Sequence, residues 1–345
     1  MAKRGRKKKV IEAINKIAKE AIESANITIK ESEEKIKKME KQDSKKKQLP
    51  KKVLLAMKEI EKKFGKGIIK TANSESLIIN RLPTGIKSLD EALGGGFPIG
   101  MITELYGEES GGKSTIVAKL IANAQKLGYL CAYIDAEHAL EEKWIKKLGV
   151  DCESMLHSET TDADNIFDVV KGLLNTKEVK LLVVDSIAAM TPKKEVSQDM
   201  EKQSMGVLAK IVNKGLRVSN TVNTRQGTAI VFINQIRDNL GVMYGPKTTT
   251  PGGKGMKFFA AIRIEVKRGE WWPNKDKKDR KGFEVICRII KNKTSVPYTE
   301  ARFILINDTG ETVEWDEANK MKKKNADIET NNVELVEDDI KSEDI

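Results

Sequence analysis

One glycine-rich stretch, residues 107–115, constrains the fold of this chain more than any other feature. Its first eight positions fit the pattern G-x-x-x-x-G-K-[ST], in which backbone N–H groups surround the phosphates of a nucleotide. The lysine of this pattern reaches the β- and γ-phosphates, and the hydroxyl that follows it coordinates Mg²⁺. We therefore predict a nucleotide and Mg²⁺ site at Gly107, Glu108, Glu109, Ser110, Gly111, Gly112, Lys113, Ser114 and Thr115.

The segments on either side of this loop have the expected character. Residues 101–106 are typical of a strand that enters the loop, and residues 116–121 of a helix that leaves it, whose N-terminus favours anions. Further apolar runs of strand length alternate with helical stretches. Because these runs are continuous, they predict a mostly parallel central sheet with helices on both faces, at residues 130–134, 181–184, 229–233, 261–266 and 285–290.

Charge is distributed unevenly along the 345 residues, whose formal net charge is +11. Residues 1–49 hold 16 Lys and Arg against 8 Asp and Glu, and they are either a solvated, partly disordered or helical basic tail or a DNA-contacting arm. A helical pattern at 51–64 ends at Gly65, and the last eighteen residues are acidic. We divide the chain into a basic extension (1–49), a helix and strand (50–75), the α/β core (76–306) and a short C-terminal segment with an acidic tail (307–345).

Cysteine usage and hydropathy exclude several classes of protein. Cys131, Cys152 and Cys287 are too far apart in sequence for a C-x-x-C pair, which argues against structural zinc. Cys131 and Cys287 lie in apolar runs and are predicted to be core residues. Few cysteines fit a reducing cytoplasm, and no apolar run is long enough to cross a membrane.

Two strands end in acidic residues that suit nucleotide hydrolysis. Asp185 follows the run 181–184 and is predicted to orient Mg²⁺, directly or through water. Glu137 is our candidate for the group that polarises the attacking water. Asp135 is the competing candidate for this role; its alternative role is hydrogen bonding at the end of the strand. We interpret His138 as a structural hydrogen-bonding residue.

Several separate segments resemble, in the right order, signature stretches of bacterial RecA recombinases: 131–140 (CAYIDAEHAL), 183–192 (VVDSIAAMTP) and 232–237 (FINQIR). The resemblance runs almost continuously from residue 54 to 306. It implies a phosphate-loop NTPase core and an ATP-dependent strand-exchange protein that forms a helical filament of its own copies on single-stranded DNA. It also implies that Gln235 couples the γ-phosphate to DNA binding, and that Lys291 and Lys293 reach the ATP of a neighbouring subunit. Trp144 stands where the family usually has a tyrosine over the adenine.

Two segments without a regular apolar pattern, about 195–203 and 238–257, match the DNA-binding loops of that family. The resemblance implies DNA contacts at Met205, Arg217, Arg237, Tyr244, Gly252 and Gly253. Tyr244 either wedges between bases or anchors its loop on the body. The first loop has fewer glycines than is usual, which leaves its individual contacts open. Ile68 and Ile69 are either a strand that docks on a neighbour's sheet edge or core residues.

The function implied is homologous pairing and strand exchange, with ATP hydrolysis driving release. A ring-forming helicase or motor of the same superfamily is the alternative, and a passive annealing protein with a decayed ATPase site is a third reading. The family's small C-terminal duplex-gathering domain is expected to be absent or vestigial here, as in phage-encoded recombinases. Residues 3–47 are expected to replace it in part by capturing double-stranded DNA.

Overall fold

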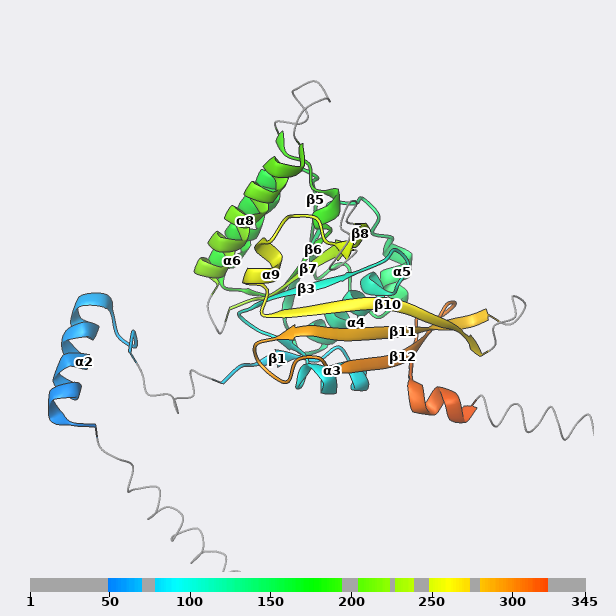
Figure 1. Ribbon diagram of the computed structural model, residues 1–345, viewed down its shortest axis with the longest axis horizontal. Helices are drawn as coiled ribbons and strands as arrows, with labels where there is room; N and C mark the ends of the chain where they lie inside the picture. Colours follow the sequence, from blue (N-terminus) through cyan, green and yellow to red (C-terminus); the bar gives the residue numbers. More distant parts are fainter. Residues whose placement is uncertain are drawn as a thin grey trace, which may run out of the picture. The chain divides into compact units, whose positions relative to one another are not determined.

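The computed structural model describes residues 49–69, 78–193, 204–223, 227–238, 248–273 and 280–321. The chain divides into two compact units, residues 1–74 and 75–345. In the first unit, α2 (Lys51–Phe64) confirms the predicted helix (Figure 1). Gly65 ends it with a positive φ of 102°, and its N–H donates to the carbonyl of Glu61 over 2.9 Å. Ile68 and Ile69 are exposed in a bend of this unit rather than in a strand, so their docking role stays a prediction. The basic residues 1–48 lie outside the described residues.

The second unit is built on a nine-stranded sheet in the order β13-β12-β11-β10-β3-β7-β6-β4-β5. The six strands from β10 to β5 are parallel, and β11, β12 and β13 extend the sheet antiparallel from β10 (Figure 1). Their bounds are β3 (Ile102–Gly107), β4 (Leu130–Asp135), β5 (Met155–Glu159), β6 (Val179–Asp185), β7 (Ala229–Gln235), β10 (Ile262–Pro273), β11 (Arg280–Asn292), β12 (Glu300–Ile306) and β13 (Thr312–Glu314).

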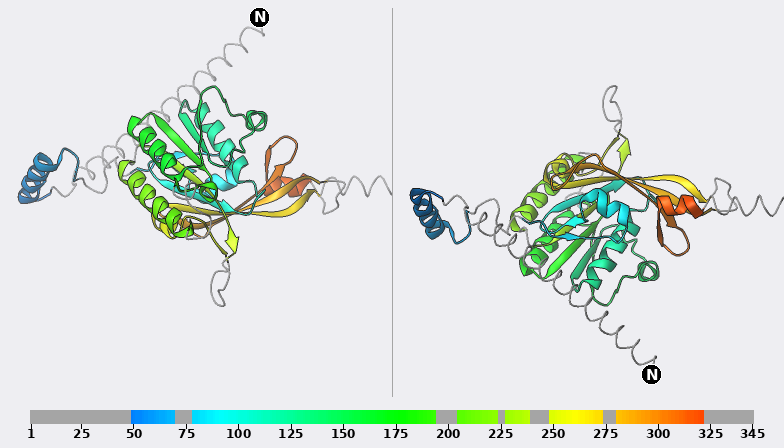
Figure 2. Two further views of the ribbon diagram at one scale, coloured as in Figure 1. Left: turned by 90° about the horizontal axis from the view of Figure 1, so that it is seen from above. Right: turned by 90° about the horizontal axis from the view of Figure 1, so that it is seen from below.

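Helices cover both faces of this sheet, because alternate residues of each strand point to opposite sides. Leu181 and Val183 of β6 join one apolar core, whereas Leu182 and Val184 join the other. The first core takes in α3 (Lys87–Leu93), α4 (Lys113–Lys126) and α5 (Glu142–Lys147); the second takes in α6 (Ala163–Thr176), α8 (Ser204–Val222) and α9 (Gly255–Phe259). The two views of Figure 2 show these layers. The predicted fold class is confirmed for the described part of the chain.

Short elements complete this unit. β1 (Arg81–Leu82) pairs with β2 (Phe97–Pro98), β8 (Arg237–Asp238) pairs with β9 (Thr248–Thr249), and η2 (Ile187–Ala189) follows β6. Cys131 and Cys287 are fully buried, as predicted. Among the described residues, no helix is long and apolar enough for a membrane span, and no cluster of three metal-ligating side chains occurs.

The hairpin of β10 and β11 is much longer than the apolar runs predicted. The sequence predicted strands only at 261–266 and 285–290, yet the pair continues to Pro273 and from Arg280. In this outer part, stacking adds to apolar burial: the guanidinium of Arg268 lies 3.8 Å from the ring centroid of Trp271, and Trp271 meets the core residue Phe283 edge-on. Cation–π and aromatic contacts of this kind stabilise an antiparallel pair without an apolar run.

Candidate nucleotide site and DNA-facing loops

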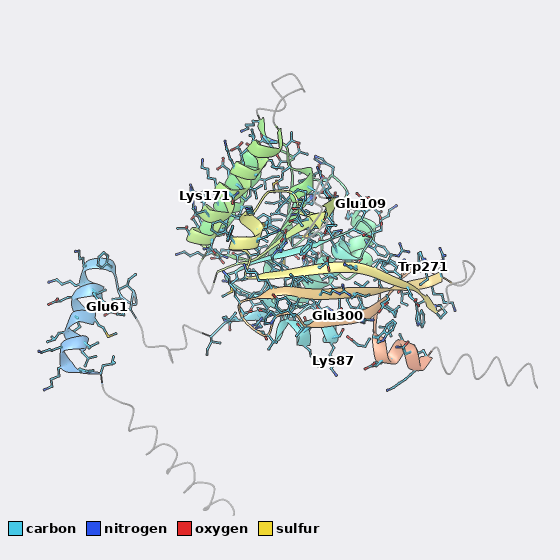
Figure 3. The ribbon with its side chains drawn as sticks, viewed as in Figure 1. Glu61, Lys87, Glu109, Lys171, Trp271 and Glu300 are labelled. Atoms are coloured by element: carbon cyan, nitrogen blue, oxygen red, sulfur yellow. The ribbon has the colours of Figure 1, made fainter. Side chains whose placement is uncertain are left out.

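The glycine-rich stretch joins β3 to α4 as predicted, at the edge of the sheet where the parallel strands end; Glu109 marks it in Figure 3. Gly107 has no room for a side chain, since a Cβ would lie 1.9 Å from the carbonyl oxygen of Val266. Gly112 begins α4 with φ of 97°, in the left-handed region that favours glycine. These constraints explain the glycines at the two ends of the loop.

Lys113 is buried at the base of the loop. Its ammonium donates to the carbonyls of Gly107 (3.1 Å) and Glu108 (2.6 Å). Burial lowers the pKa of Lys113, although the charges of Asp185 and Glu137 act in the opposite direction. The cation is thus held inside the loop by weak backbone partners that a phosphate can replace.

Asp185 ends β6 beside the loop and is almost fully buried. The hydroxyl of Tyr133 donates to its Oδ2 over 2.7 Å. Burial raises the pKa of Asp185 to about 6, against the lowering effect of the Tyr133 bond and of the Lys113 charge. Burial and the Asp185 carboxylate together raise the pKa of Tyr133, so its hydroxyl stays a donor.

One cavity of about 170 Å³ brings these groups together. Ser114 of α4, Asp135 and Glu137 at the end of β4, and Asp185 at the end of β6 all line it, from three separate segments of the chain. Hydroxyl and carboxylate oxygens are the donors that Mg²⁺ prefers, and it keeps several of its waters when bound. The donor set therefore fits the metal predicted at Ser114 and Asp185.

The two candidate acids at the end of β4 have different partners. Asp135 is buried, and its carboxylate oxygens accept the N–H groups of Glu137 (3.1 Å) and Leu140 (3.0 Å). Glu137 is exposed, and its Oε1 accepts from the amide of Gln235 over 3.1 Å and from the hydroxyl of Ser186. Asp135 thus has the strand-end role, and the geometry favours Glu137 as the group that meets water. His138 is exposed, with a positive φ of 53°.

A second cavity, of about 360 Å³, lies against residues 110–115 of the loop. Trp144 of α5 lines it, which is consistent with the adenine-stacking role predicted for this residue. Its other walls come from β11 and β12 and the turn after β12, through Phe283, Leu305, Ile306 and Asn307. Sequence reasoning missed Phe283, Leu305 and Ile306 because an apolar strand residue gives no signal of what it faces, and it missed Asn307 because a polar turn residue gives none either.

The predicted lysine pair occupies the end of β11. The ammonium of Lys291 donates to the carbonyls of Lys257 (2.6 Å) and Phe258 (3.3 Å), in α9 of its own chain. Lys293 lies beyond the last residue of the strand, and its N–H donates to the carbonyl of Ala261. The i, i+2 argument assumes extended backbone through both lysines; Lys293 directly follows the last strand residue and its N–H still pairs with the segment before β10, so the shared side of the two lysines stays a prediction.

The predicted DNA contacts fall partly within the described residues. Met205 and Arg217 belong to α8 and Arg237 to β8, and the side chains of both arginines are exposed. Tyr244 and the first loop, 195–203, lie outside the described residues. Gly252 and Gly253 have φ of 85° and 74°, and a Cβ on either would lie 3.0 Å from a carbon of η2 or α8. Their close packing on η2 and α8 is enough to explain why both positions are glycine, without any contact to DNA.

Sequence reasoning also missed a buried polar network beside the loop. Glu104 of β3 is fully buried; its Oε2 accepts from Nε of Arg263 (2.5 Å) and its Oε1 from the amide of Asn234 (3.0 Å). Asn234 also donates to the carbonyl of Pro251 and accepts the N–H of Gln235. The acidic residue in the middle of an apolar strand was the available signal, because a buried charge needs partners.

Comparison with known proteins agrees with this geometry. The family model described as the RecA N-terminal domain matches residues 51–312. The chain is similar to Protein RecA of Aquifex aeolicus, with 42% identity over 259 residues, or 74% of each chain. It is also similar to Protein RecA of Mycoplasma mycoides (41% over 257 residues, 74% of each chain) and of Thermus aquaticus (41% over 248 residues, 71% of this chain and 73% of that one).

Proposed function

The chain belongs to the RecA family of homologous DNA recombinases, and from this premise we propose that it couples ATP hydrolysis to strand exchange on single-stranded DNA. The observation that carries the proposal is the contact between Glu137 and Gln235 beside the phosphate loop. A candidate base and a candidate sensor share one hydrogen bond there, next to Lys113 and Asp185. A ring-forming motor is not favoured, because the similar proteins are RecA proteins.

The loop residues would hold ATP through their N–H groups and through Lys113, which exchanges two carbonyl partners for phosphate oxygens. Mg²⁺ bound at Ser114 and near Asp185, directly or through water, would neutralise charge on the phosphates. Glu137 would orient the attacking water and accept its proton. Since Gln235 bonds to Glu137, a change at the γ-phosphate would reach the strand end that leads into the second DNA loop.

Assembly and DNA binding complete the proposal. The exposed apolar residues of α2 would dock on a second copy of the chain, and Lys291 and Lys293 would reach its ATP. In the resulting helical filament, the positions predicted above would grip single-stranded DNA while base pairing tests a duplex: Met205, Arg217, Arg237, Tyr244, Gly252 and Gly253. We place this activity in the cytoplasm. The basic residues 3–47 would capture the duplex, so deleting 1–49 should flatten the salt dependence of duplex binding.

The decisive experiment is strand exchange between homologous substrates with ATP and Mg²⁺, with a heterologous duplex as the control. We expect exchange only with homology, and helical filaments on single-stranded DNA by electron microscopy. Lys113→Ala should lower the DNA-stimulated ATPase rate at least about 100-fold, which is the usual cost of removing one preorganised hydrogen-bond donor that stabilises transition-state charge. Closed rings that unwind duplexes, or full exchange without nucleotide, would contradict the proposal.

A further inference from the structure

Tyr133 makes a contact that the function proposed so far does not use. It lies on β4, next to β6 in the sheet, and only 4% of its surface is exposed. Its hydroxyl donates to Oδ2 of Asp185 over 2.7 Å. The bond therefore joins two neighbouring parallel strands close to the edge where both end.

This hydrogen bond determines how the Asp185 carboxylate is turned. One oxygen is occupied by Tyr133, so the group cannot rotate freely within the cavity that Ser114 also lines. Asp135, the carboxylate opposite Asp185 in register, is engaged by two backbone N–H groups and gives Asp185 no hydrogen. The hydroxyl of Tyr133 is thus the side-chain donor that fixes the candidate Mg²⁺ carboxylate.

We propose that Tyr133 is a positioning residue for the Mg²⁺–nucleotide complex, holding Asp185 so that its remaining oxygen faces the metal or a metal-bound water. The inference rests on the proposed function, because it gives Tyr133 a role only if Asp185 serves Mg²⁺. Groups that hydrogen-bond to metal-binding side chains commonly change metal affinity 10- to 100-fold. We expect a smaller effect, about three- to tenfold, because a water can stand between Asp185 and Mg²⁺.

The test compares Tyr133→Phe with the wild type in binding of a fluorescent ADP, N-methylanthraniloyl-ADP, over a Mg²⁺ titration. The variant keeps the buried ring and loses only the hydroxyl. We expect the Mg²⁺ concentration at half-maximal binding to rise about three- to tenfold, with nucleotide binding in EDTA unchanged. Tyr106→Phe, which removes the hydroxyl of another buried tyrosine in the same sheet, is the matched control and should leave the titration where it is.

A double-mutant cycle separates positioning from packing. If Tyr133 acts through Asp185, the effect of Tyr133→Phe should disappear in an Asp185→Ala background. Equal Mg²⁺ titrations for wild type and Tyr133→Phe, or an effect that persists without Asp185, would overturn the inference. A wild-type protein whose nucleotide binding ignores Mg²⁺ would instead count against the proposed function.

Discussion

Replacing Asp185 with asparagine should make the nucleotide-free protein more stable. The carboxylate is almost fully buried, and burial raises its pKa from 3.8 to about 6. A raised pKa means that the native state binds a proton more tightly than the unfolded chain does. Ionisation at neutral pH therefore costs native stability, and a neutral amide of the same shape avoids that cost while still accepting from Tyr133.

The size of the effect follows from the pKa shift. A rise of roughly two units, at about 1.36 kcal/mol per unit, corresponds to about 3 kcal/mol of stability missing from the wild type at pH 8. The proton on Asp185 stabilises the native state, and this stabilisation is complete below pH 3.8 and is lost as the pH rises to about 6. The advantage of asparagine should thus shrink to roughly half of that value at pH 5 and to less than about 1 kcal/mol at pH 4.

Urea unfolding in EDTA without nucleotide, followed by tryptophan fluorescence at pH 4, 5 and 8, measures this difference. All four tryptophans lie between residues 75 and 345, so the signal reports on the unit that contains Asp185. Asp151→Asn is the control. A hydrogen bond from Ser154 lowers the pKa of this exposed carboxyl, so its replacement should add no stability at any of these pH values. A stability difference for Asp185→Asn that is absent at pH 8, or equal at pH 4 and pH 8, would refute the reasoning.

Three further substitutions test the site. Gly107→Ala should cost about 3 kcal/mol in urea unfolding, because a Cβ meets a β10 carbonyl, whereas Gly172→Ala, with open space around it in α6, should gain about 0.5–1 kcal/mol. Glu104→Gln should cost about 3–5 kcal/mol because it leaves a buried arginine without its charge partner, and Glu300→Gln, at the surface, less than about 1 kcal/mol. Trp144→Ala should weaken N-methylanthraniloyl-ADP binding about three- to tenfold through lost stacking, while Trp144→Phe should largely retain it.

Much of the nucleotide site could be predicted because its signals are local. Lys113 and Ser114 belong to one short pattern, and Asp185 ends an apolar run. The meeting of Ser114 and Asp185 in one cavity follows from topology, since parallel strands of an α/β sheet end at the same edge. The segment order and the alternation of apolar runs with helices were therefore enough to predict that these candidate residues lie at one edge of the sheet.

The remaining parts depend on tertiary contacts that leave no local signal. The sequence gives no sign that Tyr133 contacts Asp185, because that contact depends on β6 lying beside β4. It likewise gives no sign that Phe283 lines the cavity beside the loop. Lys293 directly follows the last residue of β11, so the period-2 argument for the lysine pair depends on a strand end that the sequence does not mark. The β10–β11 hairpin exceeds its apolar runs because stacked arginines and aromatic rings support its outer half.

The network around Glu104 holds the end of β7 in place, even though Gln235 itself is partly exposed. Burying the ion pair of Glu104 and Arg263 is tolerated only while both charges keep their partners, so neither side chain can move alone. Asn234 is bound into this pair and also holds the N–H of Gln235 and the carbonyl of Pro251. The backbone of Gln235 is therefore tied at once to the strand that enters the phosphate loop and to the segment that follows β9. Because these ties are made by buried backbone and amide groups, the side chain of Gln235 remains available for Glu137.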